Sequence, residues 1–132
     1  MNIFEELHKL DLPADQFVVV GSGTMDALGM RSAQDIDIVA IPELNKKIRE
    51  SGEWKEDERY GKIFLSKGNV EILPDVSWDA YSATVQELID TALVIDGFNF
   101  MNLDELVKFK TALGREKDMN DIKLIEDYKN QK

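Results

Sequence analysis

Short hydrophobic stretches alternate with polar turns along the whole chain, and their spacing changes from one stretch to the next. The first hydrophobic positions recur at the spacing of one helix face, which predicts a short helix over residues 2–10 that Pro13 ends. The next run, Phe-Val-Val-Val between turn-forming residues, predicts a buried strand over residues 16–21. The chain therefore begins with a helix followed by a core strand.

The same spacing rules predict the remaining elements. Further strands are predicted at residues 35–41, 54–59, 62–66, 69–73, 93–95 and 98–101, and further helices at residues 25–30, 42–50, 83–92, 103–113 and 117–129. Ser22-Gly23-Thr24 is predicted to be a turn, and Asp96-Gly97 is typical of a tight hairpin. Strands and helices mix without a regular βαβ repeat, which favours an α+β fold. We expect a mixed or antiparallel sheet with flanking helices and a C-terminal tail of two helices.

Neither an internal repeat nor a linker rich in Pro, Gly or Ser divides the sequence. A chain of 132 residues has the usual size of one domain. We therefore expect a single domain over residues 1–132, with a core at about 16–101 and a helical tail at about 103–130.

The composition limits the chemistry that is open to this chain. It contains no cysteine and one histidine, His8, which excludes disulfide scaffolds, thiolate zinc sites and cysteine nucleophiles. A single histidine also cannot build a histidine-rich metal site. Catalysis would therefore depend on carboxylates, hydroxyls, lysines and the backbone.

Charge and hydropathy indicate where the protein works and what it contacts. No hydrophobic run approaches the ~20 residues that span a bilayer, and the N-terminus lacks the pattern of a signal peptide, so we expect a cytoplasmic protein without membrane contact. The formal net charge of -10 disfavours a broad nucleic-acid surface and suits cationic partners or metal-assisted handling of phosphates. Acidity that only keeps the protein soluble is the simpler reading.

Two aspartates are the first candidate for chemistry. Asp35 and Asp37 flank Ile36 on a predicted strand, so both carboxylates point to one face while Ile36 enters the core. Two like charges held close together are costly without a cation, and oxygen ligands alone select Mg²⁺ or Mn²⁺. Taken alone, an Asp-x-Asp is more often an exposed strand face.

The surroundings of this pair add to the signal. Gly21-Ser22-Gly23 follows a core strand, and small residues there let a phosphate approach backbone and hydroxyl donors, although the tripeptide alone is more often a turn. Glu71 lies on a later predicted strand, where Val70 and Ile72 would face the opposite side. This pattern fits a third carboxylate beside the aspartate pair, and it fits equally a polar position on an amphipathic strand. Asp75 competes with Glu71 for that role.

Taken together, these residues resemble the DNA polymerase β-like nucleotidyltransferase superfamily, in particular its small bacterial and archaeal minimal members. The residues that carry the resemblance, over about 16–128, are Gly21-Ser22, Asp35-Ile36-Asp37-Ile38, Glu71, Lys110 and the segment Arg115-Glu-Lys-Asp-Met-Asn-Asp121. The resemblance implies a sheet core of that type. It also implies metal-dependent transfer of a nucleoside monophosphate from an NTP such as ATP to a hydroxyl acceptor, with release of pyrophosphate.

The resemblance also assigns roles to single residues. Asp35 and Asp37 would hold Mg²⁺ or Mn²⁺, and Glu71 would join one metal and help to deprotonate the acceptor. Gly21 and Ser22 would hold the β- and γ-phosphates. Lys110 would contact a phosphate or the base. Arg115 and Lys117 fit a helix end equally well, and Asp118 is expected to be mainly structural.

Three functions are compatible with this sequence. The first is a nucleotidyltransferase acting on a small molecule or a protein, for which the acidic surface suits a cationic acceptor. The second is an antitoxin-like minimal nucleotidyltransferase that acts on a partner protein, and the third is a non-catalytic nucleotide-binding domain. A partner in a homodimer is one possible source of acceptor specificity.

Overall fold

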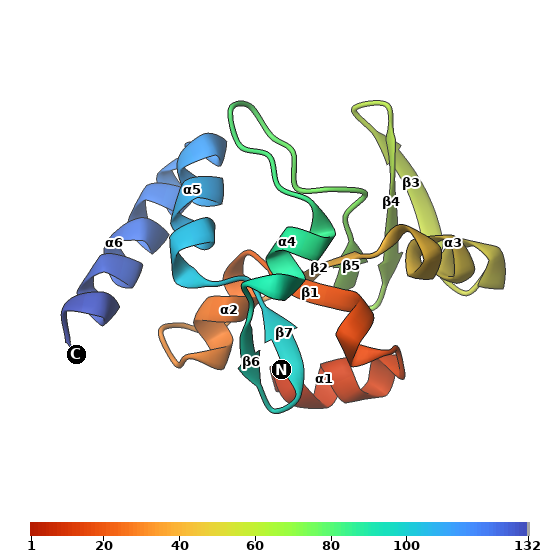
Figure 1. Ribbon diagram of the computed structural model, residues 1–132, viewed down its shortest axis with the longest axis horizontal. Coiled ribbons are helices and arrows are strands. Elements are labelled where there is room, and N and C mark those ends of the chain that lie inside the picture. Colours follow the sequence, from red (N-terminus) through yellow and green to blue (C-terminus); the bar gives the residue numbers. More distant parts are fainter. Residues whose placement is uncertain (132) are drawn as a thin grey trace.

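A seven-stranded mixed sheet organises the chain (Figure 1). The computed structural model describes residues 1–131. Within them the strands lie in the order β3-β4-β5-β2-β1-β7-β6. Their bounds are β1 Phe17–Val20, β2 Ile36–Ala40, β3 Lys55–Arg59, β4 Lys62–Lys67, β5 Val70–Ile72, β6 Leu93–Ile95 and β7 Phe98–Phe100.

Six α-helices and one short 3₁₀ helix accompany this sheet in residues 1–131. They are α1 Ile3–Leu10, η1 Ala14–Gln16, α2 Ser22–Ala27, α3 Pro42–Ser51, α4 Val85–Asp90, α5 Leu103–Leu113 and α6 Glu116–Asn130. The predicted α+β class is confirmed, and every predicted strand has a counterpart at nearly the same residues. None of the helices in this part of the chain is both long and apolar enough to cross a membrane.

Strands β1 and β2 form the centre of the sheet. They pair antiparallel, whereas β2 pairs parallel with β5 and β1 pairs parallel with β7. All four residues of β1 are buried, since the sheet is covered on both faces. Alternate residues of the strand therefore face two separate hydrophobic clusters.

Each face of the sheet has its own cluster and its own helices. Phe17 and Val19 of β1 belong to one cluster with buried residues of α1 and α3. Val18 and Val20 belong to the other, with buried residues of α4, α5 and α6. Asp37 of β2 lies opposite Val20 in the antiparallel register, so it is on the face that the C-terminal helices cover.

The predicted turn at Ser22-Gly23-Thr24 is wrong, because these residues form the start of α2. Gly21 alone makes the turn, with a φ of 67° that side-chain-bearing residues rarely adopt. Gly23 lets the helix pack on β1, since a Cβ there would lie 2.3 Å from Val19 Cγ1. The Thr24 hydroxyl also donates a 3.0 Å hydrogen bond to the Met101 carbonyl.

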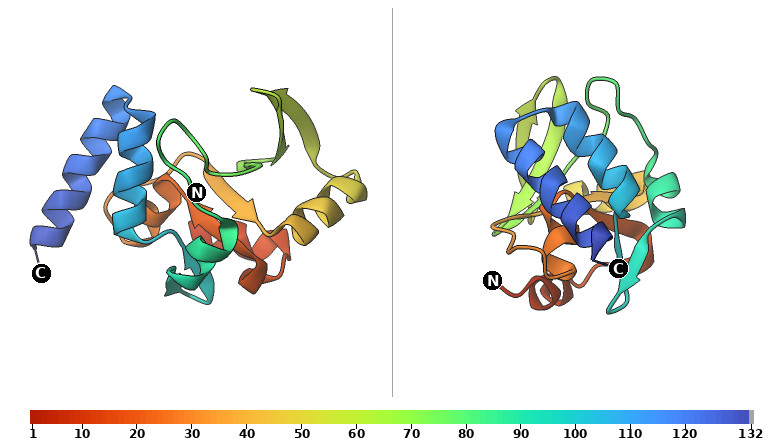
Figure 2. Two further views of the ribbon diagram at one scale, coloured as in Figure 1. Left: turned by 45° about the horizontal axis from the view of Figure 1, so that its top comes forward. Right: turned by 90° about the vertical axis from the view of Figure 1, so that its left-hand side faces the viewer.

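The two ends of the molecule differ in character. The antiparallel pair of α5 and α6 stands at one end and the β3–β4 hairpin at the other, with the 73–84 loop between them (Figures 1 and 2). Strands β3 and β6 are the edges of the sheet. Strand β3 consists of five charged residues, Lys-Glu-Asp-Glu-Arg, whereas β6 is a three-residue Leu-Val-Ile strand.

Candidate functional site

A cavity of about 860 Å³ is lined by residues of the sheet, the C-terminal helices, the 73–84 loop and the β3–β4 hairpin. Five of the six residues that the sequence singles out line it, namely Gly21, Ser22, Asp35, Asp37 and Lys110. They come from segments far apart in the chain. The sixth, Glu71, is not among the lining residues.

The sheet register places Glu71 next to Asp37. Strands β2 and β5 run parallel, and the Cα atoms of Asp37 and Glu71 are direct partners, so both side chains project from the same face. The Glu71 carboxylate accepts a 2.5 Å hydrogen bond from Arg59 Nη2. Asp37, in contrast, makes no hydrogen bond or ion pair with a side chain in residues 1–131. Unlike Glu71, it keeps a carboxylate available to a ligand.

The surroundings of Asp37 disfavour its negative charge. Burial raises the pKa of this carboxyl to about 6, and the nearby charges of Glu71 and Asp35 act in the same direction. Lys110 and Lys117 oppose them only in part. A cation bound at Asp37 would relieve this cost.

Asp35 lies one residue before β2 rather than on it, and its side chain is exposed at the cavity. Among residues 1–131, no group of three or more His, Cys, Asp or Glu side chains is arranged to hold a metal ion. The predicted trio of Asp35, Asp37 and Glu71 is therefore not assembled as a ligand set. Asp35 and Asp37 remain a chemically suitable pair, because Mg²⁺ is commonly held by one or two carboxylates together with substrate phosphates.

Asp75, the competitor of Glu71, lies after β5 and lines the cavity. Its carboxylate forms a 2.8 Å ion pair with Lys62 Nζ and accepts a hydrogen bond from the Ser77 backbone N–H at 3.0 Å. Asp75 thus helps to shape the 73–84 loop. The register puts Glu71, and not Asp75, beside Asp37.

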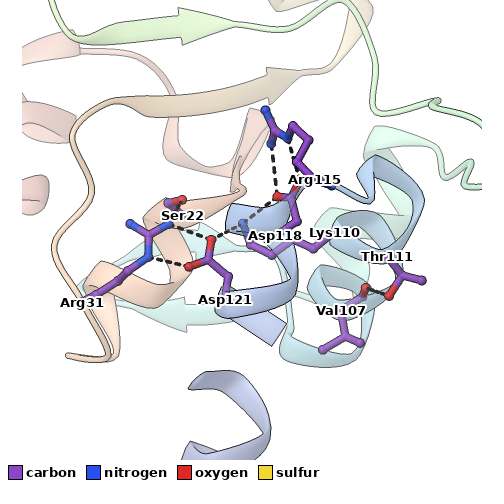
Figure 3. Close-up of polar contacts among 8 residues, drawn as sticks. All are labelled: Ser22, Arg31, Val107, Lys110, Thr111, Arg115, Asp118 and Asp121. Atoms are coloured by element: carbon purple, nitrogen blue, oxygen red, sulfur yellow. Dashed lines mark hydrogen bonds and ion pairs between the residues drawn. The ribbon is translucent and has the colours of Figure 1, made fainter. Parts of the chain in front are cut away.

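A polar cluster of four residues joins the start of α2 to the C-terminal helices (Figure 3). Arg31 donates to both carboxylate oxygens of Asp121, at 2.7 Å and 2.8 Å, and its Nη2 also donates to Ser22 Oγ at 2.6 Å. Lys110 Nζ donates to Asp121 Oδ2 at 2.9 Å. We call Ser22, Arg31, Lys110 and Asp121 the basic cluster, since its two cations outnumber its one carboxylate.

Two members of the basic cluster are buried, whereas the Arg31 side chain is 34% exposed. Lys110 is 3% exposed and Asp121 is 5% exposed. Burial opposes ionisation of Asp121, but hydrogen bonds from Arg31 and Lys110 hold its pKa below the ordinary value. Lys110 therefore lies at the cavity, as expected, but its ammonium group is fixed by carboxylates and does not extend into solvent.

Asp118 and Arg115 form the start of α6. Asp118 accepts hydrogen bonds from the Arg115 backbone N–H at 3.2 Å and from its Nε at 2.6 Å. The Asp118 carboxylate also lies 3.7 Å from Lys110 Nζ. These contacts agree with a mainly structural Asp118 and with an Arg115 that serves the helix end.

Sequence reasoning assigns no role to Arg31 or Asp121. Arg31 lies in the irregular segment between α2 and β2, where no periodicity marks a functional residue. Asp121 belongs to the motif that carries the family resemblance. Its position in the sequence is equally typical of an acidic residue on the exposed face of a helix. Asp121 lies eleven residues after Lys110 and on the next helix, so only the packing of α6 on α5 brings the two side chains together.

Comparison of the chain with protein-family models, with curated proteins and with solved structures found no match. What the protein does must therefore be inferred from the residues of this cavity.

Proposed function

We propose that the protein is a metal-dependent nucleotidyltransferase of the DNA polymerase β-like type, which transfers a nucleoside monophosphate from an NTP to a hydroxyl acceptor. One observation carries the proposal. An acidic pair, Asp35 and Asp37, and the cationic residues of the basic cluster line one cavity together with Gly21. Gly21, the acidic pair and Lys110 are also the residues that carry the resemblance to that superfamily.

The basic cluster supports the phosphate part of the proposal. Ser22 offers a hydroxyl, and Arg31 and Lys110 offer two positive charges around Asp121. The second carboxylate near Lys110, that of Asp118, is itself paired with Arg115, so three cations face two carboxylates here. Charge-assisted hydrogen bonds from such groups are the strong contacts of phosphate sites. Gly21 lies beside Asp37, since a Cβ there would be 3.7 Å from Asp37 Oδ2, and its φ of 67° is one that side-chain-bearing residues rarely adopt. We assign the β- and γ-phosphates to this side of the cavity.

Asp35 and Asp37 are the proposed protein ligands of Mg²⁺ or Mn²⁺. The donor set fits, since both ligands are hard oxygen donors and Asp37 lies in surroundings that disfavour its uncompensated charge. A bound metal would supply charge neutralisation to the triphosphate and to the departing pyrophosphate.

In the proposed reaction, the acceptor hydroxyl oxygen forms a bond to the α-phosphorus of the NTP. The bond from that phosphorus to the oxygen bridging to the β-phosphate breaks, and pyrophosphate leaves with the bonding electrons. The hydroxyl proton passes to a carboxylate, for which we propose Glu71 because it neighbours Asp37 on the sheet. Arg59 holds Glu71 in the structure, so this contact must loosen for Glu71 to take the proton.

Calorimetry of Mg²⁺ and ATP binding tests the proposal. The double variant Asp35→Asn plus Asp37→Asn removes the charge and keeps the shape, so we expect binding by the native chain and little by the variant. A matched control is Asp15→Asn plus Asp127→Asn, which removes two exposed carboxylates outside the cavity. Equal heats in the native chain and the Asp35/Asp37 variant would refute the proposal.

A transfer assay identifies the acceptor. Incubation with labelled NTPs, Mg²⁺ and a cell lysate would place the label on a small molecule or on a protein, and label on one partner protein would indicate the antitoxin-like alternative. Metal-dependent NTP binding without any transfer would indicate the non-catalytic alternative. The observation that favours this last alternative is that Lys110 already has carboxylate partners.

A further inference from the structure

Two aromatic side chains meet at the cavity, on the wall away from the basic cluster. Tyr60 lies in the turn between β3 and β4, and Trp78 lies in the 73–84 loop, yet their ring centroids are 5.4 Å apart with an interplanar angle of 78°. Both line the cavity, and they remain 75% and 41% exposed. In such an edge-to-face pair, the ring that presents its edge has neither of its faces covered by the other ring.

Tyr60 has a positive φ, which is unfavourable for a residue with a bulky side chain. Tyr60 and Gly61 form the tight turn of the hairpin with φ values of 57° and 74°. Turns of this kind favour Asn-Gly or Asp-Gly, because a bulky residue with positive φ is strained. Hairpin formation alone therefore does not explain a tyrosine here. Strain of this kind clusters at ligand sites.

The charged side chains next to the aromatic pair carry a net negative charge. Arg59 and Lys62 flank the Tyr60-Gly61 turn, and both are already neutralised. Their partners are Asp57 at 3.0 Å and Glu71 at 2.5 Å for Arg59, and Asp75 at 2.8 Å for Lys62. Three carboxylates thus face two cations, which disfavours an anionic group at this wall and favours a cationic one.

The sheet order places this wall on the acceptor side of the proposed reaction. Strands β5 and β4 lie on one side of β2, whereas β1, whose end leads into Gly21 and Ser22, lies on the other. The attacking and leaving oxygens of a phosphoryl transfer are roughly in line on opposite sides of the phosphorus. With pyrophosphate leaving toward the basic cluster, the acceptor approaches from the side of Tyr60 and Trp78.

We propose that Tyr60 and Trp78 form a cation-binding subsite for the ammonium group of an amine-bearing alcohol, which is the acceptor class of this protein. The assignment of that ligand as the acceptor rests on the proposed function. Binding of the cation itself rests only on the ring faces and the surrounding carboxylates, since aromatic faces attract organic cations.

Fluorescence of Trp78 tests the subsite directly. The chain has two tryptophans, and Trp54→Phe leaves Trp78 as the single reporter. Choline, a hydroxyl-bearing quaternary ammonium, is titrated at constant ionic strength against 3,3-dimethylbutan-1-ol, its uncharged analogue of the same shape. We expect a saturable change with choline and binding of the uncharged analogue weaker by on the order of tenfold. Because Trp54 is a core residue, calorimetry on the native chain provides a second measurement that needs no substitution.

Two substitutions at Tyr60 form a matched pair. Tyr60→Leu keeps an apolar side chain without an aromatic face and should weaken choline binding by on the order of tenfold, whereas Tyr60→Phe should retain it. Three results would each overturn the subsite. They are equal affinity for choline and the uncharged analogue, native choline affinity in Tyr60→Leu, and loss of choline binding in Tyr60→Phe. Calorimetry with Mg²⁺ and ATP is run in parallel. Choline binding without ATP binding rejects the proposed function and keeps the subsite, and the reverse pattern rejects the subsite alone.

Discussion

At the scale of single residues, the ionised carboxylate of Asp37 lowers the free energy of unfolding, and this effect depends on pH. Its pKa in the folded chain is about 6, against an ordinary value of 3.8. The folded state therefore binds this proton more tightly than the unfolded state, so the stabilising effect of protonated Asp37 is complete below about pH 4 and is lost as the pH rises through 6. At neutral pH the ionised carboxylate destabilises the fold.

Replacement of Asp37 by Asn should therefore stabilise the protein at high pH. We expect Asp37→Asn to raise the free energy of unfolding by as much as about 3 kcal/mol at pH 8, because a shift of this size corresponds to that energy. At pH 4 the two chains should differ little. Urea unfolding at both pH values measures the difference, and Asp15→Asn serves as an exposed control. A gain that is equal at both pH values would contradict the electrostatic explanation.

Glu71 and Asp75 can be distinguished by their effects on transfer. Glu71→Gln should lower the rate of nucleotidyl transfer by about 10²- to 10⁴-fold while sparing most NTP binding, because a proton acceptor acts only in the chemical step. Asp75→Asn breaks the ion pair with Lys62 and should change the rate much less. Single-turnover transfer and equilibrium NTP binding, measured for both variants, test this assignment. An inactive Asp75→Asn beside an active Glu71→Gln would reverse it.

At the scale of secondary-structure elements, Gly23 determines how α2 packs on β1. An added Cβ would lie 2.3 Å from Val19 Cγ1 and 3.3 Å from Ile3 Cδ1, in the core between α1 and β1. Gly23→Ala should therefore lower the free energy of unfolding by about 1 to 3 kcal/mol, although alanine favours a helix. Thermal or urea unfolding gives the magnitude.

A second substitution provides the control for this prediction. Val19→Ala removes the methyl group that the new Cβ would meet, so in that background Gly23→Ala should cost clearly less. An equal cost in both backgrounds would show that the clash is not the cause.

Most elements could be predicted from hydrophobic spacing, and the exceptions have physical causes. The strands around Val18 and Ile38 are recognisable because they are buried and short, and Asp96-Gly97 marks its hairpin. The start of α2 was missed because Ser-Gly-Thr has the composition of a turn. In the folded chain, Gly21 makes the turn with its positive φ, and Gly23 allows the first turn of α2 to pack closely on β1.

The candidate site was only partly readable from the sequence. The period of two predicted that Asp37 and Glu71 point away from the core face of their own strands, but it does not reveal that β2 and β5 are parallel neighbours. The family resemblance implies that Lys110 contacts a phosphate or the base, and it gives no sign that the ammonium group is buried against carboxylates. Its burial follows from Asp121, which only the packing of α6 brings to it. The convergence of Arg31 on the same carboxylate is a property of the folded chain alone.

At the scale of the whole molecule, the basic cluster links the C-terminal helices to the sheet core. Lys110→Met removes a buried charge and leaves Asp121 with Arg31 alone. We expect this variant to lose up to about 3 kcal/mol of stability and to bind NTP more weakly, because the buried Asp121 carboxylate loses one of its two cationic partners. Unfolding in urea and NTP titration at fixed Mg²⁺ measure the two effects.

Lys108→Met is the matched control on the same helix. Lys108 is exposed, and its one ion pair within residues 1–131 is with Glu105, so its loss should change stability by less than about 0.5 kcal/mol. Curves for Lys110→Met that overlay the native ones in both measurements would show that Lys110 is neither a structural link nor a nucleotide ligand.

The charged edge strand β3 has a consequence for self-association. An edge strand presents unpaired backbone donors and acceptors, which makes it a template for a strand of another chain. In β3, five consecutive charged residues line that edge, and at the opposite edge β6 offers only three residues. If a second copy docked on β3 through its own β3, the charged residues of the two strands would lie directly beside one another. The sheet is thus protected against growth from chain to chain, so the protein should resist amyloid-like aggregation even at high concentration.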